Sequence, residues 1–167
     1  VRGLFDLEHT LAKYWLENVE HPWDVVPNIG QIVTEIGQGL PADEYEQRYR
    51  SVWIHRSASV SESACLEGPC VIGPRTEVRH CAFVRGGVLV GADCVVGNST
   101  ELKNCILFDC CQVPHFNYVG DSVLGFHSHF GAGAVTSNVR ADRKPVVVHG
   151  GPSFGDAPTG LSKLGAF

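Results

Sequence analysis

The residues best suited to chemistry lie in three short stretches of the second half of the chain. The first is Glu101-Leu102-Lys103-Asn104, the second runs from His115 to Asp121, and the third runs from Gly131 to Asn138. A neutral imidazole can take a proton near pH 7 from an attacking group, and lysine and arginine side chains suit phosphate. These residue types predict acid–base chemistry on, or binding of, a small anionic molecule.

The elements that must position these stretches follow a repeat of six residues. Branched aliphatic residues recur every sixth position from Ile54 to Leu102; the pattern slips by one residue, resumes at Leu107, slips again and resumes at Leu124. A period of six fits neither a helix nor a hairpin sheet, and it is typical of a β-helix of hexapeptides with about 18 residues per triangular coil. We predict a mainly β fold, a left-handed parallel β-helix of hexapeptide repeats over residues 51–138.

Stacked coils would bring the three stretches together. Lys103 and Asp121 differ by 18 positions, and so do His115 and Gly133. Because Lys103 follows the core residue Leu102, its side chain must point outward. We therefore expect the candidate residues to cluster on one side of the rod.

The two ends of the chain depart from this repeat. Residues 1–50 predict a short N-terminal helical segment, because Leu7, Leu11, Tyr14 and Trp15 fall on one face of a helix that Asp6 could cap, and residues 29–36 repeat the pattern. Residues 139–167 predict a long loop, rich in Pro, Gly and charge, and the start of a further coil. The loop is either a disordered excursion, or a lid or an arm that reaches a neighbouring subunit.

Composition narrows the class of protein. The net charge is −5, with 44% hydrophobic and 19% charged residues, which indicates a globular chain whose main partner is neither nucleic acid nor a membrane. The seven Cys are odd in number and form no CxxC pair, so we expect reduced core thiols and a cytoplasmic location. No Walker, GxGxxG, HExxH or GxSxG motif occurs. The start at Val1 and the lack of Met suggest a piece of a longer protein.

One pair of motifs resembles a known family. His-x-x-Tyr-Val-Gly-Asp at 115–121, followed by Gly-Ala-Gly-x-x-Thr-x-Asn at 131–138, is similar to the acetyltransferase half of the bacterial bifunctional UDP-N-acetylglucosamine pyrophosphorylase/glucosamine-1-phosphate N-acetyltransferase. It also resembles the sugar nucleotidyltransferase-like proteins related to that pyrophosphorylase. The resemblance spans about residues 70–140. It implies an acyltransferase-like homotrimer that moves acetyl from acetyl-CoA to an amino sugar phosphate or nucleotide sugar, in a site between subunits.

The same resemblance assigns roles to individual residues. His115 matches the catalytic base, and the substrate-binding positions of the family fall at Arg85, Lys103, Tyr118, Asn138 and Lys144. Of these, Arg85 and Lys103 match residues that bind the phosphate and uridyl end of the ligand. Lys144 matches a loop lysine that closes over the ligand. Asn138, like Tyr118, matches a sugar and phosphate contact.

Departures from the family leave two alternatives. His129 replaces an Asn and Val139 replaces a Tyr of the acceptor site, the family coils that bind acetyl-CoA lie beyond Phe167, and helices stand in place of the pyrophosphorylase domain. One alternative is a non-catalytic sugar-nucleotide-binding or trimeric scaffold protein. The other is a zinc-dependent hydratase that uses His127 and His129, as in γ-type carbonic anhydrases; because no third ligand follows at a suitable spacing, we expect no metal in this segment.

Overall fold

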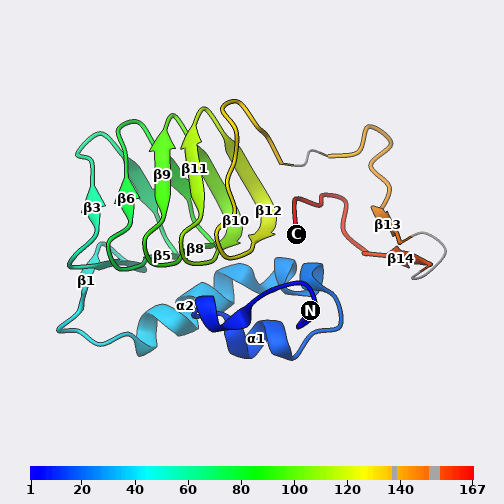
Figure 1. Ribbon diagram of the computed structural model, residues 1–167, viewed down its shortest axis with the longest axis horizontal. Coiled ribbons are helices and arrows are strands. Elements are labelled where there is room, and N and C mark those ends of the chain that lie inside the picture. The colour runs from blue at the N-terminus through cyan, green and yellow to red at the C-terminus, as the bar shows by residue number, and fades with distance from the viewer. Residues whose placement is uncertain (137–138, 151–154) are drawn as a thin grey trace.

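The chain winds into a triangular rod of parallel strands, with a helical segment along one side and an arm at one end (Figure 1). The computed structural model describes residues 1–136, 139–150 and 155–167. The predicted left-handed parallel β-helix of hexapeptide repeats is confirmed. We call the three walls of the rod face 1, face 2 and face 3.

Each face is a ladder of short parallel strands, one from each coil. Face 1 contains β2 (Val52–His55), β5 (Cys70–Ile72), β8 (Val88–Val90) and residues 105–107 and 122–124 of the long strands β10 (Glu101–Leu107) and β12 (Tyr118–Leu124). Face 2 contains β3 (Ser59–Val60), β6 (Glu77–Val78), β9 (Val95–Asn98) and β11 (Gln112–His115). Face 3 contains β4 (Cys65–Glu67), β7 (Phe83–Arg85) and residues 101–103 and 118–120 of β10 and β12.

The sixfold repeat sets the register of these ladders. Ile54 pairs with Ile72 and Ile72 with Val90, 18 residues apart each time, whereas Val90 pairs with Leu107 and Leu107 with Leu124 at 17 residues. The two slips in the pattern are therefore two coils that are one residue shorter. The stacked aliphatics are almost completely buried, which makes a continuous dry core and accounts for most of the stability of the rod.

The N-terminal segment covers face 1. It consists of η1 (Leu7–His9), α1 (Lys13–Glu17), η2 (Pro22–Asn28) and α2 (Ile29–Gly39). Helix α2 packs on β5, β8 and β10, and η2 packs on β12 (Figure 1). The cover is needed because the residues of face 1 that point outward are apolar and buried: Trp53, Val71, Leu89, Ile106 and Val123.

The helical prediction for residues 1–50 needs correction in two places. The expected helix over residues 7–15 is interrupted after η1, and both Leu11 and Tyr14 are exposed, because contacts with the rod rather than local periodicity decide these short helices. Asp6 does cap η1, since its carboxylate accepts from the N–H of Glu8. Residues 45–48 form strand β1 (Tyr45–Arg48), which pairs antiparallel with β2 and covers its open edge.

The arm leaves the rod after Thr136 and the chain returns at its end. Within it, β13 (Val147–His149) pairs antiparallel with β14 (Asp156–Pro158). The final residues then seat on β12: the N–H of Gly165 donates to the carbonyl of Asp121 at 3.0 Å, and the N–H of Val123 donates to the carbonyl of Ala166 at 2.9 Å. The excursion is therefore inserted where the fifth coil turns from face 3 to face 1.

All seven thiols are free, as predicted, but only some of them serve the core. Cys70, Cys94, Cys105 and Cys111 are buried, and burial raises the pKa of Cys70 to about 12. The thiols of Cys65 and Cys81 are exposed. Among the described residues, no helix combines the length and hydropathy needed to cross a membrane.

Asn104 ties the helical segment to the rod. It lies at a corner with a left-handed backbone (φ 49°), and its amide donates to the carbonyl of Val26 at 3.1 Å and to the carboxylate of Asp121 at 2.8 Å. Asn104→Gly keeps the backbone conformation accessible and removes both bonds. We expect a loss of about 1–2 kcal/mol in the free energy of unfolding, measured in urea, with faster proteolysis of residues 22–39. Ser99→Gly, at another left-handed corner (φ 52°), is the control; equal losses in both variants would contradict the role of the tie.

Candidate functional site

Three of the predicted ligand-binding residues lie on the outer surface of face 3. Val84, Leu102 and Val119 point into the core and are fully buried. Side chains alternate along a strand, so Arg85 and Lys103, which each follow one of these residues, and Tyr118, which precedes one, point outward. The register places Tyr118 beside Glu101 and Lys103 beside Gly120.

The charges of this surface are partly paired. The Arg85 guanidinium donates from Nη1 to Oε1 of Glu101 at 2.7 Å, and this hydrogen bond raises the pKa of Arg85. Lys103, which is partly buried, follows Glu101 by two residues on the same strand, so both side chains point outward from face 3. Glu67 lies beside Arg85 in the same ladder, so this surface carries two cations and two carboxylates. The side chains of Arg85 and Lys103 are the groups on it that could bind an anion such as a phosphate.

Tyr118 lies flat against the backbone of the same strand. A Cβ added at Gly120 would lie 2.5 Å from the hydroxyl oxygen of Tyr118, so the ring occupies the space that a larger residue would fill. Burial, with help from the nearby carboxylates of Asp121 and Glu101, raises the pKa of Tyr118. Its phenol therefore stays protonated near neutral pH and can donate a hydrogen bond to a ligand oxygen.

His115 lies at the end of β11, at the corner where face 2 turns into face 3. Its side chain is exposed, and its backbone is held on both sides. The N–H of His115 donates to Oδ1 of Asn117 at 2.9 Å, and its carbonyl accepts from the N–H of Gly133 at 3.1 Å. Phe116 and Asn117 form the corner between His115 and Tyr118, so Tyr118 begins the face 3 strand next to this corner, and Lys103 lies level with Gly120 further along that strand.

The expected spacing of 18 residues is wrong in this part of the rod. Because these coils contain 17 residues, Lys103 pairs with Gly120, not with Asp121, and His115 pairs with Asn98. Asp121 instead turns at the next corner with a left-handed backbone and is largely buried, where its carboxylate accepts from Asn104.

The two remaining predicted residues are Asn138 and Lys144. Asn138 lies outside the described residues. Lys144 is exposed in the arm that leaves the rod (Figure 1), and its backbone N–H donates to the carboxylate of Asp142 at 3.1 Å. The structure therefore places Arg85, Lys103 and Tyr118 on face 3, with His115 at the corner that precedes this face, and leaves Lys144 on a separate segment.

The histidines of the metal alternative lie elsewhere. His127 takes a left-handed conformation at a corner (φ 60°), with its ring against Phe126, and His129 pairs with Gln112 at the edge of face 2. Over residues 1–136, 139–150 and 155–167, no group of three or more His, Cys, Asp or Glu side chains is placed to hold a metal ion.

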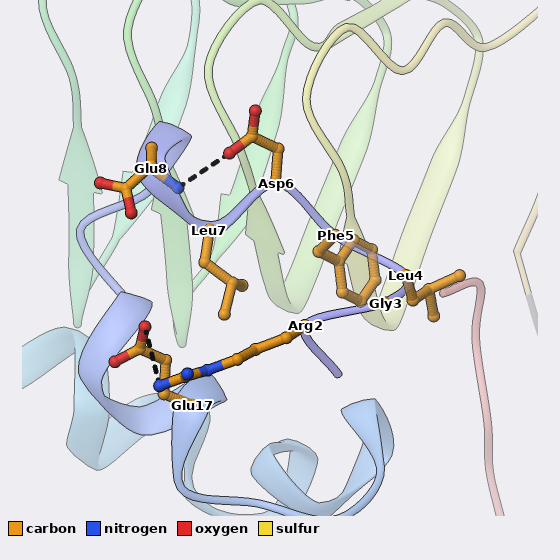
Figure 2. A pocket seen from close by; sticks show the side chains of 8 residues that line it. All are labelled: Arg2, Gly3, Leu4, Phe5, Asp6, Leu7, Glu8 and Glu17. Carbon is orange, nitrogen blue, oxygen red and sulfur yellow. Dashed lines mark hydrogen bonds and ion pairs between the residues drawn. The ribbon is translucent and has the colours of Figure 1, made fainter.

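A separate pocket of about 580 Å³ opens in the N-terminal segment. Figure 2 shows it lined by residues 2–8 and Glu17, with Arg2 reaching Glu17 at 3.5 Å. None of the predicted site residues lines it. It lies against the helical segment, so we do not assign it to the site on face 3.

Reasoning from the sequence overlooked Asn117 as part of this site. The fourth position after the face 2 core residue carries a small side chain in the other coils: Ala64, Ala82, Thr100 and Ala134. Asn117 takes this position in the coil of His115 and is 3% exposed. The break in the pattern of small residues is a signal that the sequence does contain.

Comparison with known proteins agrees with this fold. The acetyltransferase domain of PglB from Neisseria gonorrhoeae FA1090 has the same fold, with a TM-score of 0.51 and 20% sequence identity over 73% of this chain and 61% of that chain. The bifunctional protein GlmU of Methanococcus maripaludis strain C5 is 32% identical over 160 residues, which are 93% of this chain and 38% of GlmU. GlmU of Methanococcus aeolicus is 30% identical over 83% of this chain and 34% of its own.

Fold and relatives define the class as the hexapeptide-repeat, acyltransferase-like β-helix proteins. The family model described as the GMPPB C-terminal domain matches residues 66–150. The chain belongs to that family, and the similarity to GlmU confirms the resemblance indicated by the motifs. The chain spans a little over a third of the length of these GlmU relatives.

Proposed function

We propose that the chain is an acyltransferase of the UDP-N-acetylglucosamine pathway, with acetyl-CoA as the donor and an amino sugar phosphate or nucleotide sugar as the acceptor. The amine nitrogen of the acceptor attacks the thioester carbonyl while His115 takes a proton from that amine. The C–S bond then breaks, and the protonated imidazole returns the proton to the leaving thiolate. A new amide and free coenzyme A thiol result.

The observation that carries this proposal is the grouping of Arg85, Lys103 and Tyr118 on face 3, with His115 at the corner that leads into this face. The two cations would bind the phosphate of the acceptor, and the phenol of Tyr118 would donate to a sugar or phosphate oxygen. Lys144 of the arm would close over the ligand, which the separation of that arm from the rod leaves room to do. Asn138 completes the proposed set of substrate contacts. We propose no metal in this chemistry.

We further propose that the site works within a homotrimer. The chain's own helices cover face 1, so faces 2 and 3 and the corner of His115 remain for contact between copies. Phe116 is 65% exposed and Val135 is 63% exposed beside this corner, and apolar side chains of this size are common at subunit contacts. The free thiols fit a reducing compartment, which supports a cytoplasmic location.

Ligand titration tests the proposed anion site. We expect UDP-N-acetylglucosamine to bind, and Lys103→Ala to weaken its binding about tenfold because a charge-assisted hydrogen bond is lost. The loss should shrink as salt is raised. Lys163→Ala, an exposed lysine near the end of the chain, serves as the matched control, and isothermal titration calorimetry supplies the constants.

A second assay distinguishes the two candidate functions. Release of coenzyme A thiol from acetyl-CoA, in the presence of an amino sugar phosphate, supports the acyltransferase. Binding of the nucleotide sugar with no release of thiol supports the alternative of a non-catalytic binding or scaffold protein. Failure of the wild-type chain to bind the nucleotide sugar would contradict the proposed substrate class.

A further inference from the structure

Asn117 is the polar side chain most closely built into the corner that carries His115. Its side chain is 3% exposed, and all three of its hydrogen bonds go to backbone groups. Oδ1 accepts from the N–H of His115 at 2.9 Å, and Nδ2 donates to the carbonyls of Gly131 at 2.8 Å and Ala134 at 3.1 Å. A buried amide with its hydrogen bonds made in this way fixes the groups that it joins.

The same position in the neighbouring coils shows what Asn117 adds. Ala64, Ala82 and Ala134 have no polar side chain there, and Thr100 donates from Oγ1 to the carbonyl of Val113 at 3.1 Å. As Thr100 shows, a hydroxyl group is enough for a hydrogen bond from this position to the next coil. The acceptor oxygen of Asn117 is the extra feature, and it is used on the backbone of His115.

We propose that Asn117 is a positioning residue that fixes the backbone of His115 at this corner and ties it to the next coil. This inference rests on the proposed function for its catalytic consequence. With the N–H of His115 held by Asn117 and its carbonyl held by Gly133, only the two side-chain torsions of His115 stay free. The next residue, Phe116, has a left-handed backbone (φ 51°), a conformation that costs about 1–2 kcal/mol in a residue with a Cβ and that these bonds help to hold.

The test compares two buried corner residues with the same kind of bonding. Thr76 also accepts from a backbone N–H, that of Cys94 at 3.0 Å, and donates to a backbone carbonyl, that of Gly91 at 2.7 Å, at a corner without His115. Asn117→Ala and Thr76→Ala should both lower stability. Only Asn117→Ala should speed hydrogen exchange of the His115 amide, by about tenfold or more, and shift the imidazole signals of His115 in NMR spectra.

Turnover adds a second readout, measured well below the unfolding temperature of each variant. Since small displacements of a catalytic group cost up to about 100-fold, we expect kcat to fall tenfold or more in Asn117→Ala, with KM for the acceptor within about threefold. Thr76→Ala should keep the wild-type kcat. Equal losses of kcat in the two variants would overturn the positioning role.

The exchange and imidazole measurements need no turnover, so they decide the inference even if the wild-type chain proves inactive. An inactive wild type would contradict the proposed acyltransferase and leave the positioning of His115 to these two readouts. Unchanged exchange of the His115 amide in Asn117→Ala, with unchanged imidazole signals, would overturn the inference.

Discussion

His115→Asn is expected to lower acetyl transfer by about 100- to 10,000-fold, the range that a general base contributes, while binding of UDP-N-acetylglucosamine changes less than about twofold. The imidazole is exposed, so its loss should change the free energy of unfolding by less than about 0.5 kcal/mol. The large effect would arise because an amide cannot take the proton that leaves the attacking amine. Release of coenzyme A thiol gives kcat, and calorimetry gives the dissociation constant.

His80→Asn is the matched control for this experiment. His80 is also exposed, and it lies at the same corner of an earlier coil, where its carbonyl accepts from the side chain of Asn98 at 3.3 Å; Asn98 in turn pairs with His115. We expect His80→Asn to keep full turnover. If His115→Asn keeps more than about a tenth of the wild-type kcat, the catalytic base is another group.

Gly97→Ala is expected to destabilise the rod by about 3 kcal/mol, at the upper end of the usual cost of overpacking. An added Cβ at Gly97 would lie 1.7 Å from the carbonyl oxygen of Pro114 and 2.1 Å from its carbonyl carbon. These are backbone atoms of the next coil, directly before His115, so no side-chain rotation can relieve the clash. The coils must move apart, which weakens the ladder between β9 and β11 and displaces His115.

Gly131→Ala separates this clash from a general effect of replacing glycine. An added Cβ at Gly131 would meet nothing within 4 Å, and its φ lies outside the left-handed range. We expect its urea midpoint to stay close to that of the wild type, while the midpoint of Gly97→Ala falls. Equal midpoints for Gly97→Ala and Gly131→Ala would contradict the close approach of the two coils.

The rod could be predicted from the sequence because one spacing controls both burial and register. A branched aliphatic residue every six positions places Ile72 over Ile54, and the shorter step from Leu102 to Leu107 gives the shorter coil found in the structure. The N-terminal segment could not be predicted as closely. Its helices are too short to form alone, so the apolar outer side of face 1 decides which residues are buried, and the sequence pattern wrongly placed Tyr14 among them.

The candidate site could also be predicted from the sequence only in part. Because Lys103 follows the core residue Leu102, the sequence predicted that its side chain points outward. The motif predicted that it belongs to the same site as Tyr118 and His115. The partners of these residues depend on a coil one residue shorter, which sets Lys103 against Gly120 rather than Asp121. The pairing of Arg85 with Glu101 needed the structure.

The helical cover of face 1 has a consequence for how the protein behaves on dilution. An apolar face that is buried only by contact with other copies of a protein is exposed when the oligomer dissociates. The exposed fraction therefore rises as the protein is diluted. Here the helical segment and the apolar outer side of face 1, which includes Leu89 and Ile106, belong to one chain. The helices also precede the strands in the chain, so they leave the ribosome first. The apolar outer side of face 1 is therefore buried in each molecule at any protein concentration.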